Sequence, residues 1–229
     1  MTQWKDDGDL FRLMREELYT AVVGDIMDKL GLLRQYLPAR ITPLQIDMVV
    51  AGRAMPVLEA DTFGDECGNF NGTLKKTFGL MLEALDDLKE NEVYICTGSS
   101  PNYALWGELM AMRASRLKAA GAVLDGYSRD TRGIMALGFP TFSHGRYSQD
   151  QAPRGKVLDY RVPIEIGGVR IGTGDIVFGD LDGVLIVPRS HEKEVVARSL
   201  EKARGERTVA KAIQSGLSAR ESFAKFGIM

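Results

Sequence analysis

The sequence predicts a mixed α/β fold, and three observations support this prediction. First, short buried strands at 93–97 and 122–125 flank a helical pattern at 107–120, which is the order of a βαβ unit. Second, the stretch after residue 160 contains two strand pairs joined by short turns, as in antiparallel hairpins. Third, both ends of the chain have helical spacing of their apolar residues.

The N-terminal part of the chain is expected to alternate helices and strands. Residues 1–34 have the spacing of two helices, and the apolar, partly β-branched run at 48–58 predicts a buried strand. Gly52 is expected to form a bulge in that strand. A polar, glycine-rich loop is expected at 59–72, and helical spacing returns over 73–89.

The C-terminal part is expected to be antiparallel and then helical. Gly167–Gly168 separates VPIEI from VRI, and LDG separates DIVFG from VLIVP, so each pair predicts a hairpin. Residues 189–229 form a helical segment in which Ser190 is expected to open a long helix. Ser218 with Glu221 three residues later predicts a capping box for a short last helix.

Composition narrows the possible classes of protein. The chain has 229 residues, of which 45% are hydrophobic and 26% charged, and no repeat or proline-rich linker divides it, so we expect one domain over 1–229. A net charge of −2 provides no overall positive field for nucleic acid or an anionic membrane. Cys67 and Cys96 lack the spacing of a zinc site, and neither a signal peptide nor a membrane span is indicated. We therefore expect a cytoplasmic protein that binds neither nucleic acid nor membrane.

The βαβ unit brings three charged residues to one edge of the sheet. At ~1.5 Å per residue the helix at 107–120 is about 21 Å long, and the following strand returns nearly the same distance. The start of this helix and the end of the next strand therefore lie at the same edge, where open α/β sheets place ligands. Glu108, in the first helical turn, is expected to lie close to Arg129 and Asp130, which follow the strand.

These side chains indicate a pocket for a small α-keto acid. One or two carboxylates suffice to hold a hydrated Mg²⁺ ion. Arg129 offers a planar fork to a substrate carboxylate, and the free N–H groups of Leu109 and Met110 add donors at the helix start. From spacing alone a second interpretation stays open, in which the helix dipole stabilises Glu108 while Arg129 and Asp130 form an ordinary surface ion pair.

The motifs at these positions resemble those of the RraA-like family. The resemblance rests on ALWGELM (104–110), on an acidic residue followed after twenty residues by Arg-Asp within DGYSRD (125–130), and on GGVRIGTGDIVFGDLDGVLIVP (167–188). This family includes class II pyruvate aldolases that act on 4-hydroxy-4-methyl-2-oxoglutarate and 4-carboxy-4-hydroxy-2-oxoadipate, and also the regulator of ribonuclease E activity. The fold that it implies is an α/β/β sandwich related to swivelling phosphohistidine domains.

The resemblance also implies a role for each candidate residue. Asp130 would carry a divalent metal, Mg²⁺ or Mn²⁺, directly or through water, and Arg129 would bind the keto acid. Glu108, which stands where many members have Asp, would order a metal-bound water. The backbone N–H groups of Leu109 and Met110 would hold the pyruvyl carboxylate.

The implied function is that of a metal-dependent lyase. It would cleave a 4-hydroxy-2-oxo acid to pyruvate and a second keto acid, and the same site could decarboxylate oxaloacetate. The family implies a homotrimer or hexamer, in which Glu206 would act as an acid from the neighbouring subunit. The alternative is a non-catalytic regulator that binds a ribonuclease or helicase through protein–protein contacts.

Overall fold

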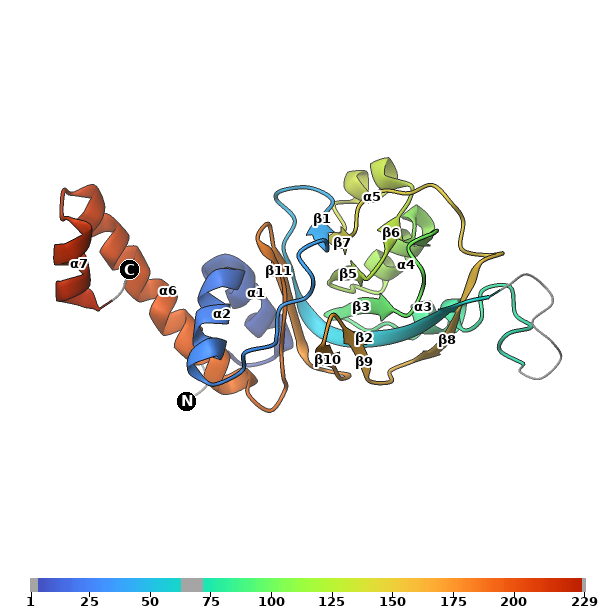
Figure 1. The fold of residues 1–229 in the computed structure, drawn as a ribbon, viewed down its shortest axis with the longest axis horizontal. Coiled ribbons are helices and arrows are strands. Elements are labelled where there is room, and N and C mark those ends of the chain that lie inside the picture. Colours follow the sequence, from blue (N-terminus) through green and yellow to red (C-terminus); the bar gives the residue numbers. More distant parts are fainter. Residues whose placement is uncertain (1–3, 63–71, 228–229) are drawn as a thin grey trace.

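The computed structural model describes residues 4–62 and 72–227, and it confirms the predicted mixed α/β fold. The main sheet has the strand order β1-β7-β5-β3-β2-β11-β12, and β8 also pairs with β2 (Figure 1). Its strands are β1 (Thr42–Pro43), β2 (Val50–Asp61), β3 (Glu92–Thr97), β5 (Gly121–Leu124), β7 (Thr141–Ser143), β8 (Gly155–Tyr160), β11 (Ile176–Asp180) and β12 (Gly183–Val187).

Parallel pairing builds the centre of this sheet. β2 pairs with β3, β3 with β5, and β5 with β7, all in parallel. The three crossovers between them carry α3 (Met81–Asp86), α4 (Glu108–Arg116) and α5 (Thr131–Leu137). The unit β3–α4–β5 is the predicted βαβ unit, which is confirmed. All residues of β3 are buried, as is typical of a strand covered on both faces.

The remaining strands form antiparallel hairpins and one short parallel ladder. β11 pairs antiparallel with β2 and β12, and β9 (Ile164–Ile166) pairs antiparallel with β10 (Val169–Ile171). The turn between β9 and β10 is Gly167–Gly168, with φ of +59° and +84°, so the predicted hairpin is confirmed. β4 (Ala104–Trp106) pairs in parallel with β6 (Tyr127–Ser128), beside the start of α4.

The two ends of the chain form helices that pack against one another. They are α1 (Asp7–Glu17), α2 (Thr20–Lys29), α6 (Glu192–Gln214) and α7 (Ala219–Phe226). Figure 1 shows α1, α2 and the first part of α6 side by side, while the rest of α6 runs away from the sheet and α7 folds back along it. A second apolar cluster, including Leu10, Phe178 and Leu200, fills the space between these helices and the sheet.

The signals for the C-terminal helices are confirmed in part. The Ser218 hydroxyl accepts a hydrogen bond from the Glu221 N–H at 3.3 Å, and the Glu221 carboxylate accepts one from the Ser218 N–H at 3.0 Å. This is the predicted capping box. The long helix begins at Glu192 rather than at Ser190, with His191 in the capping position.

Two expectations for the first half of the chain are wrong. Gly52 forms no bulge, because the pairing of β2 with β11 is regular there, and the irregularity falls between Leu58 and Glu59 instead. Gly52 permits close packing, since a Cβ at this position would lie 2.5 Å from the Asn91 carbonyl oxygen. The helix expected over 73–89 is reduced to α3.

The shortening of that helix is caused by a contact with β8. Gly79 adopts φ +63°, and a Cβ there would lie 2.1 Å from the Val157 carbonyl oxygen of β8. The next residue, Leu80, donates its N–H to the same carbonyl at 2.9 Å. The chain before α3 is therefore bound to the edge of β8, and helical hydrogen bonding starts only after this contact.

The structure also bears on the cysteines and on the expected absence of a membrane span. Cys96 is a buried free thiol in β3, whereas Cys67 lies outside the described residues. Among the helices that the structure describes, none is long and apolar enough to cross a bilayer.

Candidate active site

The ladder between β4 and β6 places the start of α4 beside the start of α5. The Arg129 N–H donates to the Trp106 carbonyl at 2.8 Å, so the residue before Asp130 is fixed to the strand that leads into α4. Gly107 follows that strand, and a Cβ on it would lie 2.7 Å from Oδ2 of Asp130. The predicted meeting of the helix start with the Arg-Asp pair is therefore present.

Asp130 holds an unusual backbone conformation at this position. It caps α5 with φ +55° and ψ +32°, in the left-handed region that most side chains avoid. Asp is one of the few residues that tolerate this region, because its short polar side chain can make local hydrogen bonds. The conformation directs the Asp130 carboxylate back towards Gly107 and the start of α4.

Glu108 lies on the other side of the same junction. A Cβ on Gly133, in the first turn of α5, would lie 2.1 Å from the carboxyl carbon of Glu108. The Glu108 side chain therefore packs against Gly133, and a larger residue at position 133 would displace its carboxylate. The cavity described below is lined by Leu109, Met110, Arg129 and Asp130, whereas Glu108 is not part of its lining.

Arg129 has a partner that the sequence did not indicate. Its Nη1 lies 2.9 Å from Oδ1 of Asp150, whereas its Nε lies 3.7 Å from Oδ2 of Asp130. Arg129 and Asp130 are thus not a simple surface pair, because the closer ion pair is with Asp150. Asp150 comes from the irregular segment between β7 and β8, and no motif marks it in the sequence.

The start of α4 supplies backbone donors to the site. Gly107 is the N-cap, and no side chain caps the helix. The first helical hydrogen bond runs from the Ala111 N–H to the Gly107 carbonyl at 3.1 Å, so the preceding N–H groups have no acceptor within the helix. Such a helix start favours an anionic group through its free donors and its dipole.

These groups meet at a cavity of about 410 Å³ between α3, α4 and the β4–β6 ladder. Its polar lining consists of Asp86, Arg113, Arg129, Asp130, Asp150 and Gln151. Its apolar lining consists mainly of Phe78, Met81, Leu82, Leu85, Trp106, Leu109 and Met110. This volume and this combination of a mostly apolar wall with a few convergent polar groups suit a small organic ligand.

A buried carboxyl group lies behind the cavity wall. Gln151 donates from Nε2 to Oε2 of Glu59 at 2.7 Å, and Glu59 is only 2% exposed. Burial raises the pKa of Glu59 to about 8, against the smaller opposing effect of its hydrogen bonds. The other carboxyl oxygen of Glu59, like the indole nitrogen of Trp106, has no hydrogen-bond partner. Sequence reasoning missed Glu59, because the residue looks like part of a polar loop.

The donor set fits a largely hydrated hard cation. Across residues 4–62 and 72–227, no three His, Cys, Asp or Glu side chains come together as a metal-binding group. Mg²⁺ does not need such a cage, since it usually keeps several waters and binds through one or two carboxylates. Asp130, with its carboxylate at the cavity, is compatible with that mode of binding.

Glu206 lies in a different part of the molecule from this cavity. It belongs to α6, where its carboxylate accepts from Tyr19 and pairs with Lys202 at 2.8 Å. Its predicted role in a neighbouring subunit stays a prediction, since it concerns contacts between chains.

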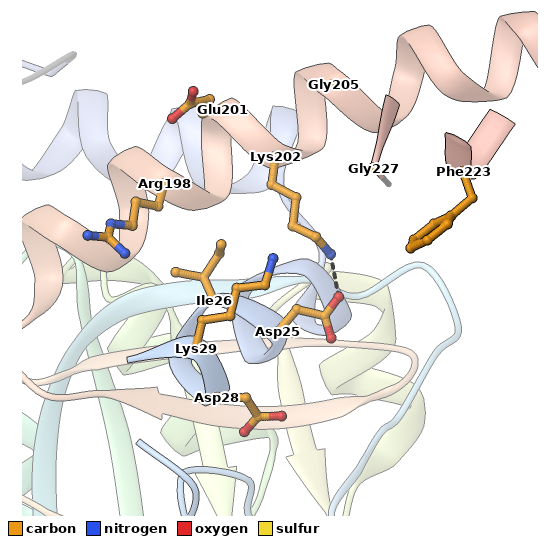
Figure 2. A pocket seen from close by; sticks show the side chains of 10 residues that line it. All are labelled: Asp25, Ile26, Asp28, Lys29, Arg198, Glu201, Lys202, Gly205, Phe223 and Gly227. Carbon is orange, nitrogen blue, oxygen red and sulfur yellow. Dashed lines mark hydrogen bonds and ion pairs between the residues drawn. The ribbon is translucent and has the colours of Figure 1, made fainter. Parts of the chain in front are cut away.

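The helices α6 and α7 together form an arm that runs away from the sheet, called here the α6–α7 arm. A larger hollow of about 840 Å³ lies between α2 and this arm. Figure 2 shows Lys202 of α6 pointing to Asp25 of α2, with Phe223 of α7 at the side. Lys202 binds Asp25 directly, and Arg198 pairs with Glu194 at 2.6 Å. Both acidic and basic side chains therefore line this hollow.

Comparison with known proteins identifies the family. The RraA-like family model, described as Aldolase/RraA, matches residues 20–186. A protein of Halalkalibacterium halodurans named "Putative 4-hydroxy-4-methyl-2-oxoglutarate aldolase" is 28% identical over 205 residues, which cover 89% of each chain.

Solved structures share the fold of this chain. One titled "Crystal structure of novel cellulases from microbes associated with the gut ecosystem" superposes with a TM-score of 0.78 at 36% identity, over 89% of this chain and 88% of that one. RraAS2 of Streptomyces coelicolor, described as an unusual member of the RNase ES inhibitor RraA family, shares the fold with a TM-score of 0.74 at 24% identity, over 90% and 98%. Since the family model spans most of the chain, the protein belongs to the RraA-like family.

Proposed function

We propose that this protein is a divalent-metal-dependent carbon–carbon lyase, which cleaves a 4-hydroxy-2-oxo acid into pyruvate and a second oxo compound. The observation that carries the proposal is the convergence of Arg129, Asp130 and the uncapped start of α4 on one cavity. The name of the Halalkalibacterium halodurans relative supports an aldolase.

Retro-aldol cleavage needs positive charge where the substrate carbonyl becomes negative. When the C3–C4 bond breaks, its electron pair moves towards the C2 carbonyl, and groups that bind this oxygen more tightly in the transition state lower the barrier. A divalent cation held by Asp130 would supply Lewis acidity at this oxygen. Oxaloacetate decarboxylation passes through the same charge distribution, so we propose it as a second reaction of the site.

The protein's own groups would bind the substrate and move its proton. Arg129, held in place by Asp150, would bind the C1 carboxylate together with the N–H groups of Leu109 and Met110. Glu108, at the junction of α4 and α5, would accept the proton of the C4 hydroxyl through a water molecule. That proton can return to C3 to complete pyruvate.

A coupled assay tests the proposal. Pyruvate release would be followed with lactate dehydrogenase, for 4-hydroxy-4-methyl-2-oxoglutarate and oxaloacetate, before and after EDTA treatment and after adding Mg²⁺ or Mn²⁺. We expect release that EDTA stops and that metal restores. Inactivity of the metal-loaded protein on a panel of 4-hydroxy-2-oxo acids would contradict the proposal, and a stable complex with a ribonuclease or helicase would then favour the regulator.

We also propose that the working form is a trimer or hexamer in which Glu206 of one subunit approaches the cavity of the next. Light scattering measures the mass of the assembly, and Glu206→Gln tests whether the Glu206 carboxyl group acts as an acid in the reaction. A monomer with full activity, or an unchanged kcat in the variant, would rule this out.

A further inference from the structure

The cavity is lined on its α3 side by apolar side chains that solvent can reach. Met81, Leu82 and Leu85 come from α3, and Leu109 and Met110 come from α4. Leu82 is 55% exposed and Leu109 is 79% exposed. An apolar wall open to water gains free energy when an apolar group covers it.

The cations of the cavity are already paired. Arg113 Nε lies 2.7 Å from Oδ1 of Asp86, and Arg129 is paired with Asp150. With Asp130 assigned to the proposed cation and Asp150 paired with Arg129, Asp86 is the carboxylate that neutralises Arg113 in the described lining. If Arg129 and the start of α4 bind the C1 carboxylate, a second carboxylate would meet Arg113 only in competition with Asp86.

We infer that the substrate is a 4-hydroxy-2-oxo acid with an uncharged, apolar substituent at C4, such as an alkyl or aryl group, and no second carboxylate. This inference rests on the proposed function. In the reaction the C3–C4 bond breaks, the C4 hydroxyl loses its proton, and the electron pair of the broken bond forms the pyruvate enolate. Protonation at C3 completes pyruvate, and the leaving fragment departs as an apolar aldehyde or ketone.

The first test compares two substrates on the purified, assembled, metal-loaded protein. We expect kcat/KM for pyruvate release from 4-hydroxy-2-oxo-4-phenylbutanoate to exceed that from 4-hydroxy-4-methyl-2-oxoglutarate by at least about tenfold, because burying a few extra carbons is worth this much discrimination. Equal values, or a preference for the dicarboxylate, would overturn the inference while leaving the lyase proposal intact.

A substitution tests the pairing of Arg113. Asp86→Asn removes the competing carboxylate, so the ratio of the two kcat/KM values should fall at least about fivefold in favour of the dicarboxylate. Glu83→Gln is the matched control, because Glu83 lies on the same helix and pairs with Lys76 outside the cavity lining. An unchanged ratio in Asp86→Asn, or an equal fall in Glu83→Gln, contradicts the inference.

Binding separates failure of the inference from failure of the proposed function. If neither substrate releases pyruvate, the lyase proposal fails, and calorimetry with 4-phenyl-2-oxobutanoate and 2-oxoglutarate still tests the cavity. Tighter binding of the phenyl compound supports the inference that the ligand is apolar. Tighter binding of 2-oxoglutarate, or no binding of either compound, overturns this inference. Leu82→Arg should weaken phenyl binding without changing the mass of the assembly. A fall in mass would mean that the apolar wall is a subunit interface, and the inference would be wrong.

Discussion

The hollow beneath the α6–α7 arm and the cavity beside α4 differ in size and in chemistry. The first is about 840 Å³ and the second about 410 Å³. Both acidic and basic side chains line the larger, where Figure 2 shows Lys202 bound to Asp25. In the smaller, the helix start has free N–H groups, and a carboxylate is held there by an unfavourable backbone conformation.

The comparison favours the smaller cavity as the candidate site, because it contains unsatisfied polar groups although its volume is smaller. Ion pairs between exposed side chains contribute little to stability and leave little for a ligand to gain. Free backbone donors and a solvent-accessible apolar wall both gain from an occupant. We therefore expect substitutions in the smaller cavity to change chemistry, and substitutions around the larger hollow to change at most local stability.

The largest expected effect is that of Asp130→Asn. This variant keeps the size of the side chain, and Asn also tolerates the left-handed region, but it removes the charge that would hold a cation. Pyruvate release should be abolished, and calorimetry should show that Mg²⁺ or Mn²⁺ binding is lost. Turnover at wild-type rates at ordinary metal concentrations would exclude a metal role for this residue.

The next effect concerns stability and pH. The folded protein keeps a proton on Glu59 up to about pH 8, whereas the unfolded chain releases it near the ordinary value of 4.5. The contribution of Glu59 to the free energy of unfolding should therefore be greatest below about pH 4.5. It should fall as the pH rises to about 8, and it should stay level above that. At about 1.4 kcal/mol per pKa unit this amounts to several kcal/mol.

Thermal unfolding between pH 5 and 9 measures this dependence. Glu59→Gln should reduce the fall in stability with rising pH. Asp25→Asn is the control, because the Asp25 side chain is 56% exposed beside the larger hollow, and this variant should show the same pH dependence as the wild type. A wild-type slope in Glu59→Gln would show that another group causes it.

A smaller effect is expected for Arg129→Ala. The variant loses a charge-assisted contact worth roughly 1.5–3 kcal/mol, which corresponds to about a 10- to 150-fold fall in kcat/KM. Arg129→Ala also leaves Asp150 without its ion-pair partner, so Asp150→Asn should be measured beside it to separate loss of the ion pair from loss of the arginine. A loss under about threefold in Arg129→Ala would contradict the binding role.

The smallest effect is expected at the arm. The helix α7 supplies Phe223 to the larger hollow. Ser218→Ala removes the capping box of this helix and should destabilise it by about 1 kcal/mol. Hydrogen exchange should be faster over 219–226, while kcat/KM for pyruvate release stays within twofold of wild type. A larger loss of activity would mean that α7 itself takes part in the reaction, and the contrast between the larger hollow and the cavity beside α4 would break down.

Sequence reasoning succeeded where local geometry determines the result. The order of strand, helix and strand is enough to bring the start of α4 beside Asp130, because helix rise and strand rise fix the distances, whereas Glu108 itself packs against Gly133. The same holds for the Gly167–Gly168 hairpin and the Ser218 capping box. Each depends on residues close together in sequence.

The missed parts depend on long-range contacts. Asp150 and Gln151 reach the cavity from an irregular segment, and Glu59 turns inward where the register of β2 shifts beside β8. The start of α3, which contributes to the apolar wall, is set by the hydrogen bonds of Phe78 and Leu80 to Val157 of β8. Periodicity along the chain carries no information about such contacts.

The left-handed conformation of Asp130 has an evolutionary consequence. A non-glycine residue held there costs of the order of 1 kcal/mol, and glycine would relieve that strain. A population of variants selected only for resistance to heat would thus accumulate glycine at this position and lose the carboxylate. The protein is a little less durable than its fold allows, and the deficit sits at the residue on which the proposed chemistry depends.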